Sequence, residues 1–294
     1  MRIVDALQGD RPTISFEFFP PKNDAAADEL LATIGAMRAL QPGFVSITYG
    51  AGGSSRDRSL DLIRRIKGEL SLEVMAHLTC AGSTAAELRA FAGELAAAGV
   101  QNVLALRGDP PRDAAGFRAP AGGFAHATDL TALLAGDYEF CIGGACYPET
   151  HTEAVDAESD LRHLVTKVNA GASYLITQLF FENERYFAFV ARARAAGITV
   201  PIIPGIMPIT NYEQVQRFTT MCGATIPPRL RAELERCASD PEAIVDLGVA
   251  FAALQCADLL ARGAPGLHFY TLNKSPAVRA VVSALRAEAV LAAA

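Results

Sequence analysis

The feature that most constrains the fold is the alternation of short β-rich runs with Ala- and Leu-rich helical segments along all 294 residues. The runs with strand character are Thr13–Phe19, Phe44–Tyr49, Leu72–Thr79, Asn102–Arg107, Glu139–Tyr147, Tyr174–Phe180, Pro201–Ile206 and Leu267–Leu272. The helical patterns between them include Ala25–Ala39, Asp57–Glu69, Thr84–Ala98, Glu158–Ala170, Asn183–Ala196 and Thr210–Met221. Strands that alternate with helices in this way predict an α/β fold, a closed parallel (β/α)8 TIM barrel. A doubly wound sheet is the alternative.

The chain shows no composition break or linker, so we expect a single (β/α)8 domain over residues 1–294. An extra helical stretch, Pro228–Arg262, precedes the last strand. Its apolar part, Ala243–Leu260, carries Asp246 and Asp258, which predicts a buried helix of a soluble protein rather than a membrane span. Met1–Leu7 has no long apolar region, so we expect no secretory signal.

Charge and motif patterns exclude several classes of function. A formal net charge of −6 argues against nucleic acid and anionic membranes as partners. The cysteines include no C-x-x-C pair, which is typical of reduced thiols in a cytoplasmic protein. The spacing of Glu149 and His151 fits no standard zinc pattern, so we expect no metal site. A G-x-S-x-G elbow is also missing from the sequence.

Period-two alternation in the first strand singles out Glu17. This residue lies on the face opposite three apolar side chains, Ile14, Phe16 and Phe18. Because the apolar face should lie under the helices, Glu17 is predicted to point into the mouth of the barrel. Burial there would raise its pKa and suit it to general acid catalysis. A structural ion pair with a barrel cation such as Arg107 explains the same spacing equally well.

The same alternation predicts a ring of polar side chains at the C-terminal ends of the strands, where barrel enzymes carry their catalytic groups. Its members are Thr48, His77, Arg107, Asp109, Tyr147, Glu149 and Gln178. A structural ion pair does not explain such a ring, so the sequence favours an enzyme. After the fifth strand, Asp160 and Lys167 share one helix face. They suit a cofactor's hydroxyls and phosphates, although a solvated helix face explains them too.

Two loops are further candidates. The backbone amides of Gly50–Ser55 could cradle a phosphate, or the segment could be a plain turn. Leu106–Pro111 opens a long loop, rich in Gly and Pro, that runs to about His126; loops of this length are usually lids or binding loops. Asp109 at its root could face a developing cation or cap a turn.

Several sequence strings occur together and in order along nearly the whole chain. They are Ser15–Lys22 (SFEFFPPK), Val45–Gly53 (VSITYGAGG), Ala76–Thr79 (AHLT), Leu106–Pro110 (LRGDP), Tyr147–Glu149 (YPE), Ala170–Ala172 (AGA), Ile176–Gln178 (ITQ), Pro204–Pro208 (PGIMP) and His268–Asn273 (HFYTLN). In combination they resemble the catalytic domain of the methylenetetrahydrofolate reductase family. The resemblance implies a flavoprotein on a (β/α)8 barrel, an oxidoreductase acting on CH–NH donors. It implies that hydride passes from NADH or NADPH to FAD, then to 5,10-methylenetetrahydrofolate in a ping-pong reaction.

The resemblance also implies roles for individual residues. Glu17 would protonate N10 of the folate, and Asp109 would stabilise the resulting cation beside the flavin. Ala172 would influence flavin retention through packing. The residues implied to contact FAD are Thr48, Tyr49, Ala51, His77, Arg107, Gly108, Asp109, Tyr147, His151, Asp160 and Lys167. The residues implied to bind substrates are Gln178, Gln214, Phe218 and Lys274.

The family context adds expectations about cellular role. We expect a cytoplasmic homo-oligomer, dimer or tetramer, in one-carbon metabolism that supplies methionine biosynthesis. The sequence ends soon after the last strand, so the resemblance is to the bacterial type without a regulatory domain, and we expect no inhibition by S-adenosylmethionine. The choice between NADH and NADPH stays open. Three rivals are a barrel aldolase or lyase, a flavin-free reductase, and a non-catalytic folate- or flavin-binding barrel.

Overall fold

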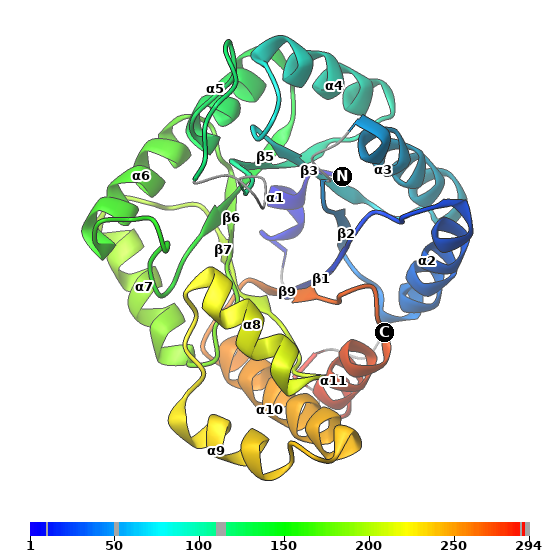
Figure 1. Cartoon of the computed structure of the whole chain (residues 1–294), viewed down its shortest axis with the longest axis vertical. Helices are drawn as coiled ribbons and strands as arrows, with labels where there is room; N and C mark the ends of the chain where they lie inside the picture. The colour runs from blue at the N-terminus through cyan, green and yellow to red at the C-terminus, as the bar shows by residue number, and fades with distance from the viewer. Residues whose placement is uncertain (10, 50–52, 110–115, 289, 292–294) are drawn as a thin grey trace.

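Nine parallel strand segments form one sheet in the described part of the chain (Figure 1). The computed structural model describes residues 1–294 except 10, 50–52, 110–115, 289 and 292–294. The segments are β1 Thr13–Phe18, β2 Phe44–Ile47, β3 Val74–Thr79, β4 Asn102–Leu106, β5 Cys141–Cys146, β6 Tyr174–Thr177, β7 Ile202–Ile203, β8 Gly205–Ile206 and β9 Gly266–Tyr270. Strand β1 pairs with both β2 and β9, which joins the first and last strands of the chain.

The seventh predicted strand, Pro201–Ile206, is divided at Pro204 into β7 and β8. Segment β7 pairs with β6, whereas β8 pairs with β9. Proline has no backbone N–H for the ladder, and the next N–H, of Gly205, donates to Thr177 Oγ1 at 2.9 Å. The two halves of one strand thus join both ends of the sheet order, and the ring closes. The predicted barrel is confirmed, and the doubly wound alternative is wrong.

Helices surround the ring, and one short helix, α1, lies inside it (Figure 1). They are α1 Ile3–Ala6, α2 Asp24–Met37, α3 Gly53–Arg65, α4 Ala85–Ala97, α5 Ala127–Asp137, α6 Ala157–Asn169, α7 Asn183–Ala195, α8 Tyr212–Cys222, α9 Pro228–Arg236, α10 Pro241–Ala261 and α11 Pro276–Ala287. The stretch predicted at Pro228–Arg262 is two helices. The second begins where the Asp240 side chain accepts hydrogen bonds from the backbone of Glu242 and Ala243.

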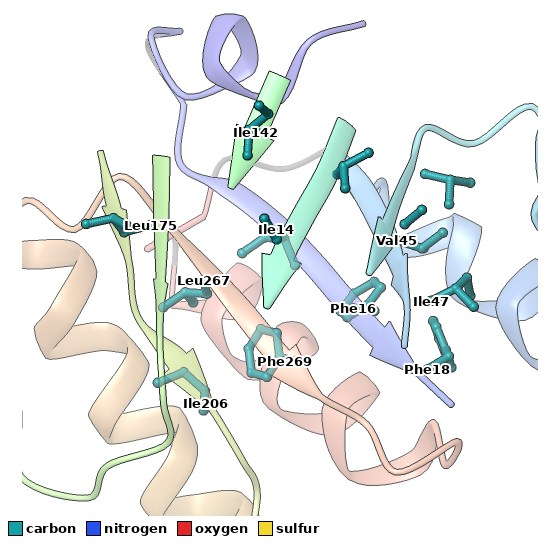
Figure 2. Packing of buried hydrophobic residues seen from close by; sticks show 14 of the residues in the cluster. Ile14, Phe16, Phe18, Val45, Ile47, Ile142, Leu175, Ile206, Leu267 and Phe269 are labelled. Atoms are coloured by element: carbon teal, nitrogen blue, oxygen red, sulfur yellow. The ribbon is translucent and has the colours of Figure 1, made fainter. Parts of the chain in front are cut away.

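The strands bury apolar side chains on both faces. Toward the helices, Phe16 of β1 packs on Phe269 of β9 with ring centroids 6.0 Å apart, in the cluster drawn in Figure 2. Inside the ring, one cluster comprises Ile3, Leu7, Phe44, Met75, Leu104, Cys141, Tyr174, Ile176 and Ile203. Helix α1 adds to it, because the Ile3 N–H donates to Asn102 Oδ1 at 2.8 Å, at the start of β4. The N-terminal end of the barrel is therefore filled.

Helix α10 is long and apolar enough, by length and composition, to cross a membrane; its mean hydropathy is 1.8, and 33% of that window is buried. In the structure α10 packs against α7 and α11. A Cβ atom at Gly248 would lie 1.8 Å from the carbonyl oxygen of Ile209, so only glycine allows this approach of helix to barrel. This packing is that of an outer-layer barrel helix.

Candidate active site

Glu17 lies near the C-terminal end of β1, and its side chain is 13% exposed. Its Oε2 is 3.5 Å from Nε2 of His77 on β3 and 3.4 Å from Nε2 of His268 on β9. The predicted inward direction of Glu17 is confirmed by these contacts with side chains from β3 and β9. The alternative ion pair with Arg107 is wrong, because Arg107 pairs with Glu153 instead.

The two histidines change the expected electrostatics of Glu17. Burial raises its pKa, but the hydrogen bond with His268 and the positive charges of His77 and His268 hold the pKa below its ordinary value. The expectation of a raised pKa is therefore corrected. Burial lowers the pKa of His77 to about 4, so this imidazole is neutral at pH 7. The lowering at Glu17 thus depends on protonated imidazole, which His77 does not supply near neutral pH.

His268 is a candidate site residue that the sequence interpretation did not single out. Its ring is fully buried, and its Nδ1 lies 2.8 Å from the Ser15 hydroxyl oxygen. The ring stacks on Phe44 with centroids 6.0 Å apart and meets Tyr270 edge-on at 5.5 Å. Alternation along β9 carries the missed signal, because it places His268 and Tyr270 on the face opposite the apolar residues of that strand.

A second polar group follows β4. The Arg107 guanidinium makes a two-point ion pair with Glu153, with Nη2 2.7 Å from Oε1. This hydrogen bond raises the pKa of Arg107, and the guanidinium carbon lies 4.9 Å from the Phe117 ring centroid. Asp109 is exposed, and its charge raises the pKa of both Arg107 and Tyr147, although burial contributes most to the rise at Tyr147. Arg107, Asp109 and Tyr147 therefore lie close enough to influence one another electrostatically.

Tyr147, Asp160 and Lys167 line one small cavity between the end of β5 and helix α6. Asp160 Oδ2 accepts a hydrogen bond from the His151 N–H at 3.0 Å, and the His151 ring packs edge-on against Tyr147 with centroids 4.6 Å apart. Lys167 Nζ donates to the carbonyl oxygen of Ala145 at 2.8 Å. Burial lowers the pKa of Lys167. The shared helix face is thus directed at the barrel rather than at solvent.

The predicted site residues after β2 do not all lie in the same place. The Thr48 N–H donates to the carbonyl oxygen of Phe18 at 2.9 Å, which places Thr48 beside the end of β1. The Tyr49 ring packs on Phe91 of α4 with centroids 5.6 Å apart, so this side chain leans into the helical layer. Ala51 and the rest of the proposed glycine cradle at 50–52 lie outside the described residues.

The predicted substrate residues come from three elements. Gln178 follows β6, and its Oε1 accepts a hydrogen bond from the Leu179 N–H at 2.8 Å. Gln214 and Phe218 lie one turn apart on α8, and Phe218 packs against the apolar cluster that contains Leu179. Lys274 follows β9 and is exposed, so no described contact brings its side chain to the others. Ala172 is buried before β6, as a packing position requires.

The donors and acceptors near β4 and β5 fit a ligand with hydroxyl and phosphate groups. An ammonium group has three donors, and the half-buried Lys167 uses one of them on Ala145. Gly108 has φ +84, and a Cβ there would lie 2.9 Å from Ala81 Cβ, so the position favours glycine. The backbone at the start of the loop after β4 is therefore not covered by a side chain at this residue. A FAD molecule carries both kinds of group. Within the described ranges, no three His, Cys, Asp or Glu side chains are grouped to hold a metal ion.

The fold and site together define a class: a (β/α)8 barrel with a buried carboxylate and a separate polar cavity at the C-terminal ends of its strands. A family model described as methylenetetrahydrofolate reductase matches residues 2–286. The chain belongs to this family.

Curated relatives agree with the family. A probable methylenetetrahydrofolate reductase (NADH) of rice is 40% identical over 284 residues, covering 92% of this chain and 48% of the relative. The 5,10-methylenetetrahydrofolate reductase of Escherichia coli is 39% identical over 264 residues, covering 89% of this chain and 86% of the relative. The chain thus spans about half the length of the plant relatives and most of the bacterial ones.

A solved structure shares the fold. It is a protein from Clostridium thermocellum described as binding two copies of 5-methyl-5,6,7,8-tetrahydrofolic acid, with a TM-score of 0.66 and 16% sequence identity. The match covers 98% of this chain and 99% of that protein. At this identity the likeness shows the barrel alone.

Proposed function

We propose that the chain is a flavin-dependent methylenetetrahydrofolate reductase, an oxidoreductase that converts 5,10-methylenetetrahydrofolate to 5-methyltetrahydrofolate with NADH or NADPH. The observation that carries the proposal is Glu17, a buried carboxyl at the C-terminal end of β1 in contact with two histidines. Family membership supports the substrate, and the plant relatives, which are described as NADH enzymes, favour NADH. We also propose a cytoplasmic enzyme of one-carbon metabolism that forms dimers or tetramers.

FAD is the proposed cofactor, and it supplies hydride transfer between the two substrates, which take turns in a ping-pong sequence. Of the residues that would hold it, Asp160 and Lys167 line the cavity beside β5, and Arg107 follows β4. Asp160 offers an acceptor for hydroxyl groups, and Lys167 and Arg107 offer cationic donors for phosphates. His77 and Thr48 lie at the Glu17 side of the same barrel mouth. In this arrangement Glu17 is not needed to bind the cofactor and can act on the folate.

Glu17 would donate a proton to N10 of the folate, which turns that nitrogen into a better leaving group and opens the five-membered ring. The opened substrate carries positive charge. Asp109, exposed at the root of the loop after β4, would stabilise that charge. The folate itself would contact Gln178, Gln214, Phe218 and Lys274, at the side of the barrel formed by β6, α8 and β9.

A spectroscopic experiment tests the proposal. Purified protein should be yellow, with the absorbance of bound oxidised flavin; anaerobic NADH or NADPH should bleach it, and 5,10-methylenetetrahydrofolate should restore the colour. A colourless protein that still reduces the folate would indicate the flavin-free rival. A reduced flavin that the folate fails to reoxidise, or a colourless protein without activity, contradicts the proposal and favours a binding barrel.

A further inference from the structure

Ser15 and His268 form a buried chain that ends on Glu17. The Ser15 hydroxyl donates to the carbonyl oxygen of Leu267 at 3.2 Å, and the same oxygen lies 2.8 Å from His268 Nδ1. A serine hydroxyl has one hydrogen. With that hydrogen directed at Leu267, the oxygen presents lone pairs to His268, so Nδ1 is the protonated nitrogen of the ring. The opposite nitrogen, Nε2, faces Glu17 Oε2 at 3.4 Å.

The fixed tautomer has a consequence for Glu17. When Nδ1 keeps its hydrogen, Nε2 of a neutral ring is a bare acceptor and needs a proton from its partner. The described contacts of the Glu17 carboxyl are with two histidines, and no Lys or Arg among the described residues forms a salt bridge with it. A buried carboxylate without a compensating charge is costly. One proton held between Oε2 and Nε2 makes the pair neutral overall, whichever atom carries it.

We propose that His268 is a positioning residue whose tautomer, set by Ser15, retains the reactive proton on the Glu17–His268 pair. The proposal rests on the proposed function of Glu17 as proton donor. In the proton-transfer step, the proton leaves Glu17 Oε2 for the substrate amine nitrogen, and the electron pair of the broken O–H bond stays on the carboxylate. The other titratable groups facing the pair are His77 on β3 and Tyr270 on β9.

The surroundings of His268 favour this role over general packing. The ring is fully buried between Phe44 and Tyr270, and Glu17 is the only described acid or base that contacts its Nε2. Ser15 is likewise fully buried. The chain of contacts from Ser15 through His268 therefore ends at Glu17, the proposed proton donor.

The first test reads the tautomer directly. Flavin-bound protein labelled with 15N-histidine contains five histidines, and the His268 signals are assigned by their loss in His268→Gln. Near pH 7, long-range 15N–1H spectra should show a hydrogen on Nδ1 of His268. A hydrogen on Nε2 with a bare Nδ1 would overturn the proposal. This measurement does not depend on turnover, so it stands even if the proposed reaction proves wrong.

The second test uses Ser15→Ala. Without its acceptor the ring is free to place its hydrogen on Nε2, which stabilises ionised Glu17. The pH profile of flavin reoxidation by the folate should then move about one unit toward acid, whereas bleaching by NADH is unchanged. Ser15→Thr keeps a hydroxyl and should restore the profile. An unmoved profile in Ser15→Ala overturns the proposal.

Ser46 supplies the matched control for the serine substitution. It lies in register with Glu17 on the neighbouring strand β2 and is fully buried, and its hydroxyl has no hydrogen-bond partner among the described residues. Ser46→Ala removes the same atom at the same depth and should leave the pH profile in place. An equal shift in both alanine variants would mean that the change comes from repacking, which overturns the proposal. A wild-type flavin that folate fails to reoxidise overturns the proposed function instead.

Discussion

The two sides of the barrel mouth differ in how they hold charge. On the side of β1, β3 and β9, Glu17 meets two buried histidines and no stronger cation among the described residues. On the side of β4, β5 and α6, full charges are paired or partly open to water, as in Arg107 with Glu153. An imidazole can accept and return a proton, so a carboxyl in contact with histidines can share one with them, whereas a carboxyl paired with arginine stays ionised. The difference supports the proposal that proton transfer takes place on the first side and that the charged groups of the cofactor bind on the second.

The largest expected effect tests the first side. Glu17→Gln keeps the shape of the side chain and removes its proton, so flavin reoxidation by 5,10-methylenetetrahydrofolate should slow by about 10²- to 10⁴-fold. Reduction of the flavin by NADH should keep its rate. Stopped-flow absorbance of each half-reaction checks this; equal losses in both would assign Glu17 to structure or flavin binding.

The second prediction uses the burial of His77. Its pKa is lowered to about 4 in the folded chain, from 6.5 unfolded, so the unfolded chain binds the proton first as pH falls. The contribution of neutral His77 to the free energy of unfolding is therefore complete above pH 6.5. As the pH falls from 6.5 to 4, the free energy of unfolding decreases by about 3 kcal/mol. Urea unfolding between pH 7.5 and 4.5 should show this loss in the wild type and a flatter dependence in His77→Gln.

The control for His77 is His163→Gln, which removes an exposed histidine on α6. It should keep the wild-type pH dependence of the free energy of unfolding. If His77→Gln and the wild type lose stability in parallel, His77 is not held neutral by burial, and the contrast between the two sides of the barrel mouth weakens.

The third prediction tests the second side. Lys167→Met removes the half-buried ammonium but keeps an unbranched side chain, so FAD binding should weaken by about 2 kcal/mol, roughly thirtyfold in Kd. Arg162→Met removes an exposed charge from the same helix and should leave the Kd unchanged. Flavin fluorescence titration measures both. Unaltered affinity in Lys167→Met would place the cofactor elsewhere.

The smallest effect on stability is expected at the exposed ion pair between Arg107 and Glu153. The Glu153 side chain is 53% exposed, so Glu153→Gln should lower the free energy of unfolding by less than about 1 kcal/mol. Urea unfolding of Glu153→Gln, Arg107→Gln and the double variant gives the coupling between them. A coupling free energy of several kcal/mol between Arg107 and Glu153 would show that this side is shielded from water as well as the Glu17 side is.

Much of the fold could be predicted from local pattern. The β-rich runs located the strands of the described chain, and alternation within the first run predicted the inward direction of Glu17, because period two is a local property of extended chain. The division of the seventh strand at Pro204 depends on which neighbours each half pairs with, and Tyr270 and Thr177 meet there only in the closed ring. Helix α5 was also missed.

For the candidate site, the positions of several side chains could be predicted from the sequence, but their partners could not. Alternation and family resemblance supplied Glu17, His77 and Lys167. They did not supply the pairing of Arg107 with Glu153 or of Glu17 with His268, residues that lie 46 and 251 positions apart. The direction of the Glu17 pKa was wrong for this reason: burial is readable from a strand pattern, but two histidines brought in by other strands are not.

The most direct measurement compares one variant from each side of the barrel mouth. Both half-reactions are followed in Glu17→Gln and in Lys167→Met, each with saturating FAD. If the sides are separate, Glu17→Gln retains bound flavin and loses only the folate step, whereas excess FAD restores both steps in Lys167→Met. A selective loss of the folate step in flavin-saturated Lys167→Met, or loss of flavin in Glu17→Gln, would contradict the division of labour.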